Sequence, residues 1–156
     1  MERQQTVAIL GELLALEQRS LAPRLLESTV SISTLAAPAL TLVKRMAAAT
    51  QENSSILVKM ILDLGGTPPP RNYPISTAEL HFQDLTHVLP RLVADEETIV
   101  RSFTLAAQRL SPDPRALAVV NSILQRHQRQ LKELASATNP HSLIEKATSR
   151  VSGGTS

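Results

Sequence analysis

The sequence predicts an all-α protein, and three observations support this fold class. Apolar residues recur at alternating spacings of three and four, which is the period of a helix, and no segment sustains the alternation of a strand. Only 2% of the residues are aromatic, so the core must be built from aliphatic side chains. With 156 residues the chain has the length of one domain that needs no disulfide or structural metal. These properties favour a four-helix bundle.

The first helix is expected over about residues 4–28. Its inner stripe consists of Leu10, Leu14, Leu21 and Leu25. Pro23 is expected to kink this helix, because proline removes one backbone hydrogen bond and crowds the carbonyl four residues earlier.

The second helix is expected over about residues 37–64, with Leu42, Met46, Leu57, Met60 and Leu64 on its inner stripe. It is followed by Gly65-Gly66, and glycine readily adopts the left-handed conformation that ends a helix. The sequence therefore predicts a sharp stop at this point.

Two capping signals define the other helices. The third is expected to open with a capping box at residues 76–79, to bend at Pro90, and to end near Leu110. The fourth is expected to begin at Asp113-Pro114, an N-cap followed by proline at the first helical position. Short connections make helices one and two antiparallel, and likewise helices three and four.

The connection between helices two and three is long and rich in proline. Residues 65–74 read GGTPPPRNYP, and a dozen extended residues reach ~35 Å. The second helix is about 40 Å long at 1.5 Å per residue. The linker can thus run lengthwise along the bundle, which favours a long crossover over a simple up-and-down arrangement.

Composition excludes several functional classes. The chain has no cysteine, and its net charge of +2 gives no basic field, so neither a thiol site nor nucleic-acid binding is expected. No signal peptide or membrane span is predicted, which fits a cytoplasmic protein. Residues 1–138 are expected to form the bundle, and residues 139–156 a flexible C-terminal tail.

Polar residues interrupt the inner stripe of every predicted helix near its midpoint. These residues are Glu17, Thr50, Asn53, Glu96, His127 and Gln130. Buried carboxylates must be paired, protonated, hydrated or metal-bound. Three interpretations remain open: a hydrogen-bonded core layer, a metal site of Glu17, Glu96 and His127, or a wrong stripe, with Glu97 inward or Glu17 at the surface.

The Leu64-Gly65-Gly66-Thr67-Pro68-Pro69 ending, the crossover, the two mid-helix glutamates and the run ILQRHQRQL at 123–131 resemble the ferritin-like superfamily of bacterioferritins and rubrerythrins. The resemblance covers about residues 7–134. It implies two metal ions held by a Glu on two helices and a Glu-x-x-His motif on the other two. Glu17 and Glu96 match the lone glutamates.

The motif positions depart from that pattern. Thr50 and Asn53 stand at the first motif, and His127 and Gln130 at the second, so both motif carboxylates are missing. Two carboxylates cannot balance two iron ions, so the resemblance implies a degenerate di-metal site with no cofactor expected. The alternative is a reduced site that binds iron or manganese.

The expected function follows from this loss. A non-catalytic ferritin-like bundle is predicted to act through protein association, as a homodimer or as part of a larger assembly. Leu26, Leu35 and Ala36 are candidate contact residues. The alternative is a metal-binding protein or weak oxidoreductase that uses Glu17, Glu96 and His127.

Overall fold

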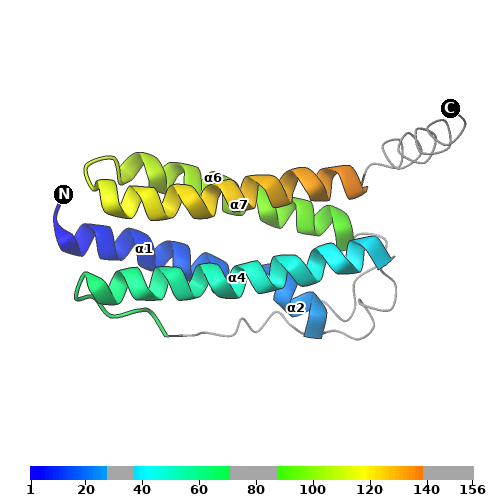
Figure 1. Cartoon of the computed structure of the whole chain (residues 1–156), viewed down its shortest axis with the longest axis horizontal. Coiled ribbons are helices and arrows are strands. Elements are labelled where there is room, and N and C mark those ends of the chain that lie inside the picture. The colour runs from blue at the N-terminus through cyan, green and yellow to red at the C-terminus, as the bar shows by residue number, and fades with distance from the viewer. Residues whose placement is uncertain (28–36, 71–87, 139–156) are drawn as a thin grey trace, which may run out of the picture.

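The computed structural model describes residues 1–27, 37–70 and 88–138, and every regular element in these ranges is an α-helix. The helices are α1 (Arg3–Gln18), α2 (Leu21–Glu27), α4 (Ala37–Asp63), α6 (Val88–Arg109) and α7 (Pro114–Thr138). The short α2 follows α1 near one end of α4, and the helices lie side by side as a bundle (Figure 1). The predicted all-α helical bundle is confirmed.

Side-chain contacts fix the directions of the helices. Glu12 of α1 meets Arg109 at the end of α6, whereas the Leu21 amide meets Asp95 further back along α6, so these elements run antiparallel. Glu17 of α1 meets Asn53 of α4, and Gly66 after α4 packs near Val7. Helix α1 is therefore antiparallel to both α4 and α6, which run in the same direction (Figure 1). The path of residues 71–87 lies outside the described residues.

The prediction of one continuous helix over residues 4–28 is wrong. The chain leaves helical geometry at Arg19 and Ser20, so that two helices replace one kinked helix. The break lies four residues before Pro23, because the proline ring crowds the Arg19 carbonyl and has no N–H to donate to it. Pro23 itself sits in the first turn of α2, where its missing N–H costs little.

Contacts from other elements stabilise the break. The Ser20 hydroxyl donates to the Glu17 carbonyl at 2.9 Å, which occupies an acceptor at the end of α1. The Leu21 amide donates to the Asp95 carboxylate of α6 at 3.0 Å, which caps the start of α2. A side chain from a distant helix thus takes the place of a local capping residue.

The predicted C-terminal end of α4 and the predicted start of α7 are confirmed. Gly65 has φ +77°, its amide donates to the Leu62 carbonyl, and the Gly66 amide donates to the Ile61 carbonyl, which is the Schellman pattern. Asp113 caps α7, since its carboxylate accepts the Ala116 amide at 3.2 Å. The capping box at 76–79, the contact residues Leu35 and Ala36, and the tail at 139–156 lie outside the described residues.

The core consists of two apolar clusters. One contains Leu10, Leu57, Phe103 and Val120, among others, and lies toward the start of α1. The other gathers α2, the first half of α4, residues 88–93 and the end of α7, with Leu25 and Leu134 fully buried. The inward polar residues lie between the two clusters. Within the described ranges, no helix is both long and apolar enough to cross a membrane.

Candidate functional site

A buried triad of ionisable side chains occupies the centre of the bundle. His127 of α7 contacts Glu96 of α6 through Nδ1, with 2.5 Å to Oε1, and contacts Glu17 of α1 through Nε2. The three residues are at most 3% exposed. Phe103 lies beside the imidazole, with ring centroids 5.2 Å apart. Three helices therefore converge on one imidazole ring.

The triad holds His127 in its protonated form. Burial alone would lower the pKa of His127, but hydrogen bonds to Glu17 and Glu96 and the charges of both carboxylates outweigh it and raise the pKa to about 10. An imidazolium carries a proton on each ring nitrogen and can donate to both carboxylates. Burial raises the pKa of Glu96 above its usual value, against the opposing hydrogen bond and charge of His127.

Helix α4 contributes an amide that links the triad to the surface. The Asn53 side chain is fully buried, and its amide N–H donates to Glu17 Oε1 at 3.4 Å. Its carbonyl oxygen accepts from Arg126 at 3.2 Å, and the same guanidinium reaches Glu52 at 3.0 Å. This role of Arg126 could not be predicted from the sequence, because its position in the fourth helix predicts an outward-facing side chain.

A second polar contact joins the helix break to the same layer. Thr50 of α4 is 7% exposed, and its hydroxyl oxygen lies 3.4 Å from that of Ser20. Ser20 was not among the predicted site residues, since it lies in the segment expected to be continuous helix. The break therefore brings an additional hydroxyl into the layer.

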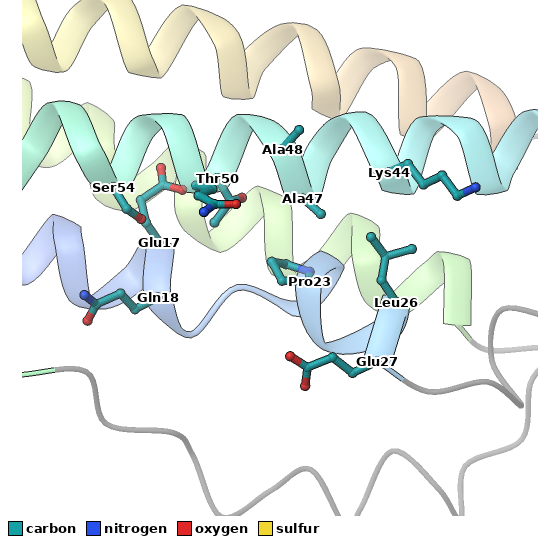
Figure 2. A pocket seen from close by; sticks show the side chains of 11 residues that line it. Glu17, Gln18, Pro23, Leu26, Glu27, Lys44, Ala47, Ala48, Thr50 and Ser54 are labelled. Carbon is teal, nitrogen blue, oxygen red and sulfur yellow. The ribbon is translucent and has the colours of Figure 1, made fainter.

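A cavity of about 410 Å³ opens beside the triad, between α4 and the junction of α1 and α2. Figure 2 shows the Glu17 carboxylate at one end of this cavity, between Ser54 and Thr50, with Pro23 and Leu26 along the wall. Glu17 Oε2 is buried and has no hydrogen-bond partner among the described residues. A buried carboxylate with one unpartnered oxygen therefore borders the cavity.

Most of the predicted layer comes together. Glu17, Thr50, Asn53, Glu96 and His127 are buried. The alternative interpretation, in which Glu17 lies at the surface or Glu97 replaces Glu96 in the interior, is therefore incorrect.

Two neighbours of the layer face outward. Glu97 is exposed. Gln130 is half-buried and lines a surface groove between α4 and α7 together with Arg129 and Glu133. The structure separates Gln130 from the triad because it lies almost one turn beyond His127, on the side that faces this groove.

The three predicted metal ligands meet through hydrogen bonds. Each ring nitrogen of His127 faces a carboxylate oxygen, so a metal ion could reach the imidazole only by displacing one of the carboxylates. In the described part of the chain, no group of three or more His, Asp or Glu side chains is arranged to hold a metal ion. The arrangement fits a charge-paired layer better than a coordination shell.

Replacing Asn53 with alanine is expected to lower the free energy of unfolding by about 1–3 kcal/mol. The change removes a donor to the fully buried Glu17 carboxylate and an acceptor for the half-buried Arg126. Urea unfolding followed by circular dichroism measures the difference. Ser55→Ala is the matched control on the exposed side of α4 and should change stability by less than ~0.5 kcal/mol. Equal effects of the two changes would contradict a linking role for Asn53.

Comparison with known proteins adds no identification. No protein-family model matches the chain, and no curated protein matches it significantly.

Proposed function

We propose that this chain is a cytoplasmic, non-catalytic helical bundle of ferritin-like arrangement that acts through protein association, as a homodimer or within a larger assembly. The observation that supports this proposal is the occupation of both imidazole nitrogens by carboxylates. An imidazolium held in this way has no lone pair with which to bind a metal or accept a proton. The charged layer then serves to fix how the helices pack.

The parallel run of α4 and α6 supports the ferritin-like part of the proposal. Two neighbouring helices that run in the same direction need a connection that spans the bundle. This agrees with the long crossover expected between the predicted second and third helices, which correspond to α4 and α6. The buried positions of Glu17 and Glu96 match the lone glutamates of that superfamily.

Leu62 on α4 is the contact residue that we favour for association. It is 56% exposed and lines a surface groove together with the half-buried Val58, and the rest of the groove is lined by polar and charged side chains, which include Lys59 and Asp63. Leu105 on α6 is equally exposed, but the exposed Arg101 and Arg109 lie about one helical turn before and after it. An exposed leucine beside a second apolar side chain is the better anchor for a partner.

The mass of the native assembly tests the proposal. Size-exclusion chromatography with light scattering should give at least twice the 16.9 kDa of the chain. Leu62→Glu should shift the assembly toward the monomer, whereas Leu105→Glu, the matched control, should leave it unchanged. A monomer at all concentrations and no co-purifying protein would overturn the proposal.

A metal-binding or weak oxidoreductase role is the second candidate. Its support is the convergence of Glu17, Glu96 and His127, together with the free Oε2 of Glu17. Carboxylate and imidazole suit iron or manganese, provided that one carboxylate releases His127. Elemental mass spectrometry of protein from iron- and manganese-supplemented cells distinguishes the two candidates. Near-stoichiometric metal that is lost in Glu96→Ala would favour this role and contradict the non-catalytic one.

A further inference from the structure

The cavity between α4 and the α1–α2 junction combines features that a random surface hollow lacks. Its volume of about 410 Å³ falls within the range of small-ligand sites. Its inner end is a carboxylate from a residue with no exposed surface, and one oxygen of that carboxylate has no partner among the described residues. A buried acceptor left in this state favours a ligand that brings a donor.

The charges around Glu17 specify what kind of donor is needed. Glu17 and Glu96 both contact the single imidazole of His127, so the triad contains two acidic side chains and one basic one. The guanidinium of Arg126 hydrogen-bonds to Asn53 and Glu52, and not to Glu17. Because acidic side chains outnumber basic ones in this buried layer, the layer favours a cationic group over a neutral donor.

The walls of the cavity specify the rest of the ligand. Thr50 and Ser54 place hydroxyl groups beside the Glu17 carboxylate, and both are buried. Pro23, Leu26 and Ala47 form an apolar wall between this end and the mouth (Figure 2). The exposed side chains of Glu27, Lys44 and Gln51 also line the cavity, toward solvent. A polar floor with an apolar wall suits a short amphipathic molecule.

We propose that this cavity binds a small aliphatic primary amine as its ammonium ion. The ammonium donates to Glu17 Oε2 and to the hydroxyl oxygens of Thr50 or Ser54, and the alkyl chain packs against Pro23 and Leu26. A bare metal ion would leave the apolar wall without a partner. A carboxylic acid would place a second negative charge beside Glu17.

Binding of n-butylammonium to the full chain tests the proposal. In a ¹⁵N-labelled sample, the amides of Gln18, Thr50 and Gln51 should shift saturably with up to about 10 mM of the amine, a concentration that suits the weak affinity of so small a ligand. Equal concentrations of n-butanol and butyrate should give no saturable shifts. Absence of saturable shifts with n-butylammonium, or equal shifts with butyrate, would overturn the proposal.

Two variants locate the binding. Glu17→Gln removes the charge and should raise the Kd for n-butylammonium about 10- to 100-fold, the range expected for a charged hydrogen bond. Ala47→Leu fills the apolar wall without touching the triad and should raise the Kd about 10-fold or more. Ala118→Leu on the exposed side of α7 is the matched control and should leave the Kd unchanged.

The second variant keeps the test decisive if Glu17→Gln does not fold. Unchanged binding in Ala47→Leu would then overturn the proposal. Displacement of the amine by micromolar Mn²⁺ would also contradict it, because the carboxylate would then serve a metal.

Discussion

His127→Ala is expected to lower the free energy of unfolding by about 3–5 kcal/mol. The imidazole of His127 lies between the carboxylates of Glu17 and Glu96 and contacts both. Its removal leaves two buried carboxylates facing each other across a cavity beside Phe103. Chemical denaturation at neutral pH measures the change, and the loss should be accompanied by an unaltered helix content at low denaturant.

Two controls make this result specific. Gln130→Ala changes a half-buried side chain of the same helix outside the triad and should cost less than ~1 kcal/mol. Replacing the whole triad at once, by Glu17→Met, Glu96→Met and His127→Leu, should recover most of the lost stability, because a buried ion triad can be exchanged for apolar side chains of similar volume. A cost below ~1 kcal/mol for His127→Ala would contradict a buried, charge-paired imidazole.

Stability is expected to fall as the pH rises from about 6.5 to about 10. The imidazole of His127 has a pKa near 6.5 when unfolded and of about 10 in the folded protein, so between these values only the folded state holds the proton. The contribution is therefore complete below pH 6.5 and is lost progressively as the pH rises toward 10. Urea unfolding at several pH values measures this slope.

The carboxyl groups of Glu96 and Asp95 also make the folded protein less stable as the pH rises. Burial raises the pKa of Glu96 and of Asp95, so each holds its proton to higher pH in the folded state than in the unfolded state. Their contribution is present below the unfolded pKa and is lost as the pH rises through the raised one. The variant in which the triad is apolar lacks both His127 and Glu96, so it should show a much flatter pH dependence. If the free energy of unfolding changes with pH equally in the original protein and in this variant, the triad is not the source of the pH dependence.

The inward positions of the polar residues could be predicted from the sequence. Glu17, Asn53, Glu96 and His127 each continue the apolar stripe of their own helix, and a helical stripe has a fixed period. The helix ends at Gly65 and Asp113 could be predicted as well, because both depend on the conformational preference or the hydrogen-bonding capacity of the residue itself. Local geometry is sufficient for predictions of this kind.

The break at Arg19 and Ser20 could be predicted only in part. Pro23 indicates a disturbance, but whether the helix bends or stops depends on what the freed backbone groups contact. The Asp95 carboxylate caps α2 from α6, at a distance of 74 residues in the sequence. The residues around the break do not indicate that Asp95 is the capping partner.

The sequence by itself determined the helical class, the ends of two helices and the polar character of the bundle centre, because these follow from residue preferences and from a period of 3.6. Only the tertiary structure decided that one imidazole lies between two carboxylates, that Asn53 meets Arg126, and that Glu17 faces a cavity. Such contacts join residues as far apart as 110 positions. They depend on the register and rotation of packed helices, which the stripe of a single helix does not specify.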